Sequence, residues 1–485
     1  NNNVMSQSSQ FSITKCHISA DRFGGFDRKF YDVKANVIDL NIYESLENPY
    51  LTATISLIDD KGLFEIINFD GTERIKIEIA GMGKNVDPVF ERTFIMVGLD
   101  RQIKAKDNAS VFLFSLIDEH AYISEVQRLR SSYRGTLSDI IAKISAQELD
   151  KDIDVSYTLD ADEKIIDSVQ TEMRVIVPNL NPIDAMTWLL SRATTKTGSP
   201  FYLWATIHDD NLRLGNLDVM LKQQAFNHKL PYTYNSANIS VAETQDDFAQ
   251  GFTIKTIEER GTSDTLALAQ SGSISADYCV TNLNTGQIFM KKYDIDTLLT
   301  NLSNEGTIDK RFQNVFDDKF KLKDKPINEY RSSIIHNVVS SGTYGEYKSY
   351  HDEYDKPLHL KKLEGTAVKN LLFKNMRTVV VPGTAFLVGK AAVGDIVNLN
   401  IRNDNTENAT NEDNTLDQNK SGHYLIHDLR HTFRETSHEV AMSVSKLERK
   451  GTKESQLSGR GAKQKPNIKK NSNSERRILR GKRII

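Results

Sequence analysis

Short runs that alternate apolar and polar residues occur in two parts of this chain, and they restrict its fold more than any other feature. The first set lies within residues 11–118. Its clearest runs are 37–42, 51–58, 74–79 and 111–116. Turn-forming pairs such as Asn48-Pro49 and Asp70-Gly71 separate them. Because side chains on a strand point alternately to two faces, this period of two predicts half-buried antiparallel strands and a first all-β unit over residues 1–118.

The second set of strand-like runs lies near the C-terminus. Its members are 378–383, 395–400, 423–426 and 440–445. Residues 239–256 also have a strand pattern, and we expect them to pair with this set. The sequence therefore predicts a second, discontinuous strand-rich unit formed by residues 231–257 and 377–450.

Between these units the hydrophobic period changes to that of helices. Thr136 is a predicted N-cap with Asp139 three residues later, and a second helix is predicted to begin at Asn181-Pro182. Strand-like residues follow at 201–204 and 212–214. Residues 119–230 are therefore predicted to form an α+β unit, with Trp188 and Trp204 in its core.

Three further segments are more polar. Residues 258–376 are predicted to be an insertion domain with one helix near 360–376, and residues 403–419 an exposed loop. Residues 451–485 form a basic C-terminal extension with eleven Lys or Arg and two acidic residues, so the rest of the chain has a net charge near −12. The extension has the composition of a disordered segment.

Length and cysteine usage restrict the protein class. A chain of 485 residues is too long for one hydrophobic core. Cys16 and Cys279 form no disulfide framework and no cysteine-rich metal site, which favours a reducing cytoplasm. We find no run of about 18 apolar residues and no signal-peptide pattern, so we expect a protein that is not membrane-bound and is not exported by that route.

The candidate reactive residues favour structural roles. His423, His427 and His431 recur every four residues, but their surroundings are strand-like, and the outer two would lie about 26 Å apart on a strand. The pairs Asp59-Asp60 and Asp246-Asp247 are predicted to be solvated turn residues. The sequence contains no nucleophile elbow and no phosphate-binding glycine loop. We therefore predict no catalytic, cofactor-binding or metal-binding residues.

The basic extension has three possible roles. Its cations could bind phosphates of nucleic acid, dock on an acidic partner or keep the chain soluble. The apolar pairs Ile478-Leu479 and Ile484-Ile485 favour docking, and we expect the extension to reach a neighbouring chain. The basic residues near these pairs are Lys463, Lys465, Lys469, Lys470, Arg476, Arg477, Arg480, Lys482 and Arg483.

Taken in order, several segments give the chain a more specific likeness. In the N-terminal half they are Ile42-Tyr43-Glu44, residues 51–59, residues 116–120, residues 178–182 and residues 201–204. In the C-terminal half they are Val381-Pro382-Gly383, Val393-Gly394-Asp395, residues 422–426 and His431-Thr432-Phe433. In this order the chain resembles the baseplate hub protein of contractile-tailed bacteriophages of the T-even type, which is related to the spike modules of type VI secretion systems. The likeness covers most of residues 11–450, and residues 258–376 and the basic extension depart from it.

The resemblance implies a mainly β fold with α+β parts, in which each chain supplies two small tube-forming β-barrels. Three chains would form a pseudo-sixfold ring that adapts the hexameric tail tube to the trimeric central spike. The implied partners are two further copies, the tail tube protein and the central spike protein, with the tape measure and baseplate wedge proteins as additional candidates. DNA would pass through the channel without sequence-specific binding. The protein would be a non-enzymatic part of the virion tail baseplate, assembled in the host cytoplasm.

Two other functions stay open from the sequence. One is a peptidoglycan- or glycan-degrading tail enzyme with its site in residues 258–376. The other is a DNA-binding factor that acts through the basic extension, with an affinity that falls steeply with salt.

Overall fold

The computed structural model describes most of the chain and is mainly β with α+β parts, as predicted. The described residues are 11–81, 88–106, 109–159, 162–166, 173–195, 198–234, 251–260, 265–283, 286–304, 321–330, 334–339, 358–374, 376–387, 389–402, 416–417, 420–446 and 478–479. Most of the predicted loop at 403–419 and all but two residues of the basic extension lie outside this part.

The first strand-rich unit contains seven strands, and each of the four clearest predicted runs coincides with one of them. They are β1 (Phe11–Ser19), β2 (Tyr31–Asp32), β3 (Val37–Ser45), β4 (Thr52–Asp59), β5 (Arg74–Gly81), β6 (Pro88–Lys106) and β7 (Ala109–Asp118). The short helices are η1 (Asp21–Phe23), η2 (Lys34–Asn36) and α1 (Leu63–Ile67). On β3, β4 and β7 alternate residues are buried, so one face of these strands forms the hydrophobic core.

The middle part of the chain combines helices with small sheets. Its elements are α2 (Glu119–Glu125), β8 (Ser132–Gly135), α3 (Leu137–Glu148), β9 (Ile153–Tyr157), β10 (Met173–Ile176), α4 (Pro182–Arg192), β11 (Phe201–Trp204), β12 (Leu212–Asn216) and α5 (Leu217–Leu221). Both predicted caps are present, because the side chain of Thr136 accepts from the backbone N–H of Asp139 and that of Asn181 from Asp184. Trp204 is fully buried and Trp188 packs against the core, as predicted.

The second strand-rich unit repeats the order of elements of the first. It contains β13 (Tyr232–Tyr234), β14 (Thr256–Arg260), β20 (Met376–Pro382), α11 (Thr384–Leu387), β21 (Ile396–Ile401), β22 (Gly422–Arg434) and β23 (Ser437–Lys446). The series β3, β4, α1, β5, β6, β7 therefore has the same order as β14, β20, α11, β21, β22, β23. The strand neighbours also correspond, since the first unit pairs as β3-β4-β7-β6 and the second as β14-β20-β23-β22.

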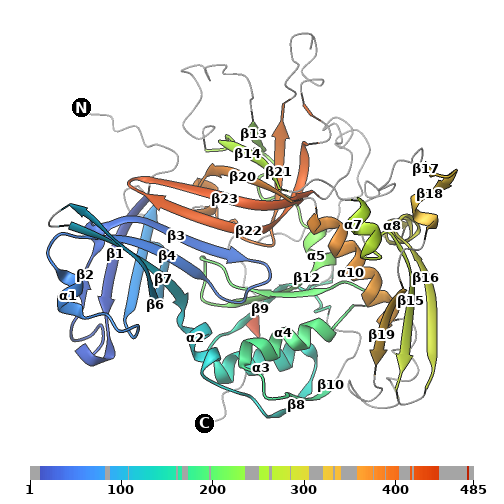
Figure 1. Ribbon diagram of the computed structural model, residues 1–485, viewed down its shortest axis with the longest axis horizontal. Coiled ribbons are helices and arrows are strands. Elements are labelled where there is room, and N and C mark those ends of the chain that lie inside the picture. The colour runs from blue at the N-terminus through green and yellow to red at the C-terminus, as the bar shows by residue number, and fades with distance from the viewer. Residues whose placement is uncertain are drawn as a thin grey trace, which may run out of the picture.

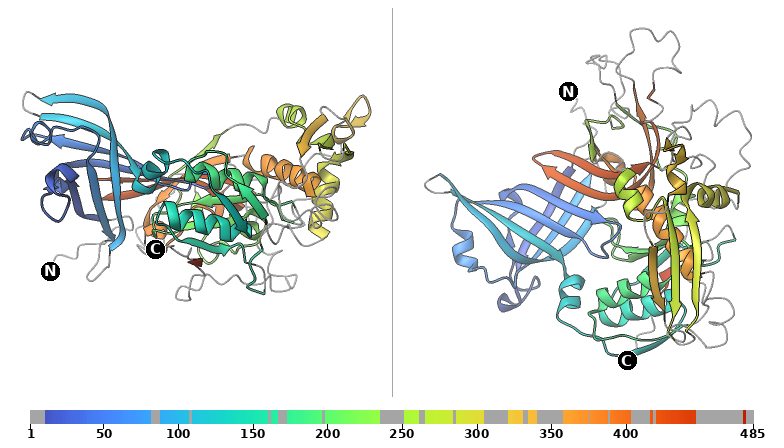
Figure 2. Two further views of the ribbon diagram at one scale, coloured as in Figure 1. Left: turned by 90° about the horizontal axis from the view of Figure 1, so that it is seen from below. Right: turned by 45° about the vertical axis from the view of Figure 1, so that its right-hand side comes forward.

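A single seam joins the two units into one sheet. Strand β22 of the second unit pairs antiparallel with β3 of the first, from Asp428 opposite Ser45 to Arg434 opposite Asp39. The result is a 13-stranded sheet, in which the red and blue strands lie side by side in Figures 1 and 2. The middle part lies below this sheet in Figure 1.

The insertion lies at the far side of the molecule from the first unit (Figure 1). Its described elements are α7 (Thr265–Gln270), β15 (Ser275–Asn282), β16 (Ile288–Asp294), α8 (Ile295–Asn304), β17 (Lys321–Leu322), β18 (Lys325–Pro326), η4 (Ile327–Glu329), β19 (Ile334–Val339) and α10 (Leu358–Lys374). The helix predicted near 360–376 is thus α10, and residues 376 onward are already strand. The insertion separates β14 from β20, whose counterparts β3 and β4 are joined by a short turn.

Close packing explains why two positions in the resembling segments, 383 and 394, are glycine. Gly394 has a φ of +88°, and a Cβ there would lie 3.0 Å from Cζ2 of the buried Trp204. A Cβ at Gly383 would lie 1.8 Å from Nδ1 of His438. Both positions therefore require a residue without a side chain, because the second strand-rich unit packs closely there against an aromatic ring or an imidazole.

We expect Gly394→Ala to destabilise the protein more than Gly25→Ala. Gly25 also has a positive φ, of +74°, but nothing lies within 4 Å of its missing Cβ, so its substitution should cost only about 1–2 kcal/mol for the backbone. Gly394→Ala should add about 1–3 kcal/mol for the collision with Trp204. Denaturant unfolding of both variants measures the difference, and equal losses would contradict the packing role of Gly394.

Candidate functional site

The surface around the seam is the most distinctive candidate site of the chain. One row of polar residues runs across five neighbouring strands, each residue directly opposite the next in the strand register. The row consists of Glu439, Thr432, Asn41, Thr54 and Ser115. All five lie on the sheet face away from the core and are half-buried. The seam therefore extends one polar face continuously over both strand-rich units.

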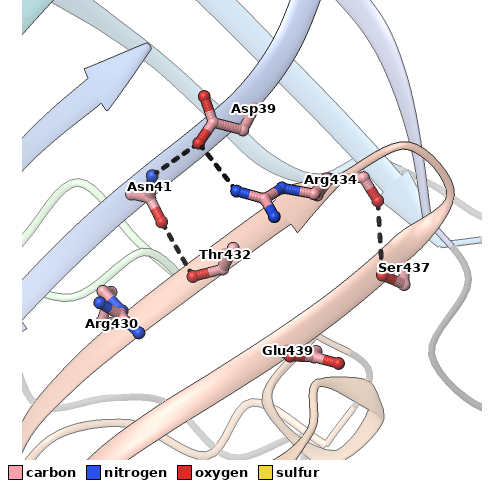
Figure 3. Close-up of a pocket in the computed structure, with 7 residues that line it drawn as sticks. All are labelled: Asp39, Asn41, Arg430, Thr432, Arg434, Ser437 and Glu439. Atoms are coloured by element: carbon pink, nitrogen blue, oxygen red, sulfur yellow. Dashed lines mark hydrogen bonds and ion pairs between the residues drawn. The ribbon is translucent and has the colours of Figure 1, made fainter. Parts of the chain in front are cut away.

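A hollow of about 450 Å³ opens on this face (Figure 3). It is lined by Asp39, Asn41, Arg430, Thr432, Arg434, Ser437 and Glu439. Across the seam, the Thr432 hydroxyl donates to Oδ1 of Asn41 at 2.9 Å, and Nη2 of Arg434 lies 3.6 Å from Oδ2 of Asp39. These contacts connect side chains from β3 and β22.

The hollow has the chemistry of a hydrated surface rather than of a reaction centre. Each of its carboxylates has a cation as partner, Arg434 for Asp39 and Lys255 for Glu439. Arg430 is exposed and has no ion-pair partner within the described part of the chain. The residues that the structure describes contain no group of three His, Cys, Asp or Glu that could hold a metal ion.

The opposite face of the seam contains a buried polar cluster. Nε2 of His431 lies 3.1 Å from Oε1 of Glu44, and Nδ1 of His431 lies 3.2 Å from Nε2 of His438. All three side chains are inaccessible to solvent. Because a carboxylate only accepts, His431 donates to Glu44 through Nε2. The cluster therefore links β3, β22 and β23 inside the core.

The middle part completes this cluster. The backbone N–H of Ile207 donates to Oε1 of Glu44 at 3.1 Å, and Nε2 of the neighbouring His208 contacts the carbonyl oxygen of Ala391 at 2.8 Å. Burial lowers the pKa of His208 to about 4 and that of His438 well below its usual value. Burial acts to raise the pKa of Glu44, but the hydrogen bond and charge of His431 leave it lowered. Glu44 is therefore held ionised inside the buried cluster.

The structure places the predicted histidines on β22, which is extended as the sequence indicated. A β-bulge at His427 shifts the strand register between Ile426 and Asp428. His427 bonds Asp428 through Nδ1 at 2.9 Å and packs edge-on against Phe373, whereas His431 enters the buried cluster. His427 and His431 therefore have separate environments. From the sequence, Glu44 was named only within a resembling segment, and His208 and His438 were not named, because no local pattern connects residues so far apart.

The prediction for Asp59 is wrong. Its carboxylate is buried and accepts from the backbone N–H groups of Lys61, Leu63 and Phe64. It is therefore a helix-capping group at the start of α1 and not a solvated turn residue. Asp246-Asp247 lie outside the described residues.

The middle part also contacts each strand-rich unit through polar groups, among them the buried side chains of Arg92 and Tyr157. On one side, Nη1 of Arg92 from β6 lies 2.6 Å from Oδ1 of Asp210, and its Nη2 donates to the carbonyl oxygen of Thr206 at 2.8 Å. On the other side, the hydroxyl of Tyr157 donates to Asp395 at 3.0 Å and accepts from Arg213 at 3.2 Å. Thr206 and Asp210 of the middle part thus contact the first strand-rich unit, and Tyr157 of the middle part contacts the second.

Two residues of the basic extension are placed on the middle part. Strand β24 (Ile478–Leu479) pairs antiparallel with β9, so that Ile478 lies opposite Asp154 and Leu479 opposite Ile153. The apolar pair that favoured docking therefore covers the edge of a sheet within its own chain. Docking of the extension on a neighbouring chain stays a prediction.

Comparisons with known proteins give distant similarities. No protein-family model matches the sequence, and no curated protein matches it. The tail protein from Neisseria meningitidis MC58 aligns with a TM-score of 0.46 and 11% identity, over 90% of this chain and 97% of that one. The 43 kDa tail protein of prophage MuSo2 from Shewanella oneidensis has a TM-score of 0.45 and 11% identity, over 89% and 98%.

A third similar structure is an E. coli component of the type VI secretion system, described as similar to T4 bacteriophage tail proteins. It has a TM-score of 0.37 and 10% identity, over 86% of this chain and 76% of that one. Two of these structures are thus described as tail proteins and one as a component of the type VI secretion system. At these scores and identities the similarity assigns no role to any residue. Within the described residues, no helix has the length and apolar character needed to span a membrane.

We expect stability to fall on acidification and His208→Gln to reduce this loss. The folded-state pKa of His208, about 4, is below the ordinary value of 6.5, so the unfolded chain binds a proton first as the pH falls from 6.5 to 4. The proton uptake of His208 alone should lower the free energy of unfolding by roughly 2–3 kcal/mol at pH 4.5 relative to pH 7. Urea unfolding at both pH values tests this, with the exposed His228→Gln as the control. Equal pH dependence in the two variants would contradict the role of His208.

Proposed function

We propose that this chain is the structural baseplate hub of a phage tail, forming a homotrimeric ring between the hexameric tail tube and the trimeric central spike. One observation carries the proposal: two units with the same element order are joined edge to edge by β22 and β3. A chain that joins two similar units in this way can supply two neighbouring members of a repeating ring. Three such chains would place six equivalent units around one axis.

The two ends of the sheet support the symmetry change. The turns of the β6–β7 and β22–β23 hairpins lie at one end, where Lys106 faces Ala109 and Arg434 faces Ser437. Each chain supplies two such turns, so a trimer would offer six similar turns to a hexameric partner. We assign this end to the tail tube.

The other end of the sheet is different in the two units. There β7 leads into α2 and the middle part, and β14 leads into the insertion. Each occurs once per chain, so three chains would present a threefold surface. We assign this end to the central spike, whose partner surface must have that symmetry.

The polar face of the sheet is the surface that we assign to the DNA conduit. Its central row consists of Thr, Ser, Asn and Glu residues, and the one aromatic ring that the described residues place beside this row at the seam is that of Tyr43, which is 38% exposed. Asp39 and Arg434 pair with each other across the seam, which limits the excess of either charge. Such a surface would let DNA pass without sequence-specific binding.

A non-enzymatic role in the virion tail is part of this proposal. In the described residues of the insertion, the buried carboxylate of Glu364 pairs with Lys291 and so contributes to packing. Zymography on the purified protein tests the alternative of a peptidoglycan- or glycan-degrading enzyme. Lytic activity that is lost with one acidic substitution in residues 258–376 would favour that alternative.

We expect the purified protein to have three times the 54.8 kDa mass of one chain. Multi-angle light scattering over a range of concentrations measures the mass, and class averages from electron microscopy should show a ring with six lobes at one end and threefold symmetry at the other. A protein that stays monomeric at every concentration, alone and with its spike, would contradict the hub function. A dimer or a tetramer would contradict it equally, because neither arranges six units in a ring.

A further inference from the structure

We propose that the unpaired edge of β6 in one chain pairs antiparallel with β14 of a second copy, with the register of the internal seam between β22 and β3. The proposal rests on the ring proposed above, because it specifies the contact that would close that ring. It goes beyond the ring by naming the two strands, their register and the side chains that meet.

Strand β6 corresponds to β22 residue by residue through their hairpins. Ala109 and Ser437 are the first paired residues after the two hairpin turns, so they correspond to each other. Val111 on β7 and Glu439 on β23 each lie two residues further along and therefore also correspond. Ile103 pairs with Val111, and Thr432 pairs with Glu439. Ile103 is therefore the counterpart of Thr432, which is a seam residue.

Strand β14 corresponds to β3 by the same reasoning on the other side of each unit. Asn41 lies opposite Thr54, which lies opposite Ser115. Glu258 lies opposite Thr378, which lies opposite Ser443. Ser443 is the counterpart of Ser115, so Glu258 is the counterpart of Asn41. Because Thr432 and Asn41 face each other in the internal seam, Ile103 and Glu258 should face each other between copies.

Both edges are unpaired in the described part of the single chain. Strand β6 pairs with β5 from Pro88 to Ile95, and from Gly98 onward it pairs with β7 alone. Strand β22 is divided in the same way, because it pairs first with β21 and then with β3. Strand β14 pairs with β20 on one side, and the other side has no described partner strand. Among the described strands, the outer edge of β14 and the later part of β6 are thus left without a strand neighbour.

The exposure of apolar side chains on β6 agrees with a missing neighbour. Leu99 is 41% exposed and Ile103 is 49% exposed, although both lie on a strand of a large sheet. Leu429, which pairs with Met442 as Leu99 pairs with Phe114, is only 2% exposed and belongs to the hydrophobic core beside the internal seam. A second copy on β6 would bury the corresponding surface.

The charges of the two edges are also complementary. Arg101 and Lys104 are exposed on β6, and Glu258 and Glu259 are exposed on β14. In the proposed register Lys104 lies diagonal to Glu259 and Arg101 diagonal to Glu258, within reach of long side chains. An exposed strand edge with unpaired N–H and C=O groups can pair with the wrong chain, and folded proteins usually cover or protect such edges.

Disulfide trapping tests the register in the full-length chain. In a Cys279→Ser background, Ile103→Cys is introduced into one preparation and Glu258→Cys into another, so that neither chain can form the proposed link within itself. The native Cys16 is buried and is retained. After mixing and mild oxidation we expect a covalent dimer on non-reducing gels. The pair Lys104→Cys and Ile257→Cys, on the other face of the strands, should give the same result.

Two controls make the result specific. Ile103→Cys mixed with Glu259→Cys places the two thiols on opposite faces of the proposed sheet, so little dimer should form. Asn41→Cys with Thr432→Cys in one chain should give an internal disulfide and shows that the oxidation works across a seam of this geometry.

The outcomes separate this proposal from the proposed function. Dimer formation by both pairs and not by the control supports the seam. A trimer by light scattering in which neither pair forms a disulfide, or in which the control pair reacts equally well, overturns the seam and leaves the hub standing. A protein that is monomeric at every concentration, alone and with its spike, overturns both.

Discussion

The backbone ladder between β22 and β3 determines how the rest of the molecule is arranged, because both faces of the sheet depend on its register. On the inner face it brings His431 to Glu44, and on the outer face it brings Thr432 to Asn41. A slip by one residue would move His431 to solvent and Arg430 into the core. The buried cluster and the polar row therefore exclude every register except one. The relative position of the two units follows from that register.

A backbone ladder alone lets two strand-rich units twist somewhat against each other. The middle part restricts the angle between them, because it contacts both. Arg92 binds it to the first unit, and the group of Arg213, Tyr157 and Asp395 binds it to the second. Buried charges contribute little net stability but are costly to separate, so they favour one arrangement over near alternatives. This matters for a ring, because a small error in the angle between units is repeated at every seam and prevents closure.

The sequence predicted those features that depend on neighbouring residues. Alternation placed β3, β4, β5 and β7, and the caps at Thr136 and Asn181 placed α3 and α4. Features that depend on distant residues could not be predicted in this way. The cluster joins Glu44, His208, His431 and His438, and no local period connects them. Asp59 was misread because its partners are the N–H groups of a five-residue helix, which is too short to give a period.

The difference between the internal seam and the proposed seam between copies follows from when each one would form. The internal seam is made as the chain folds, so it can place His431 and Phe433 against Glu44 and Leu40 without exposing them. Their counterparts on β6 are Gln102 and Lys104, which are exposed in the single chain. A strand edge that waits in solution for a partner must stay soluble, and lysine on such an edge opposes pairing with the wrong strand. The polar residues on β6 are therefore what an edge that pairs only during assembly requires, and the apolar Leu99 and Ile103 beside them supply the surface that a correct partner would bury.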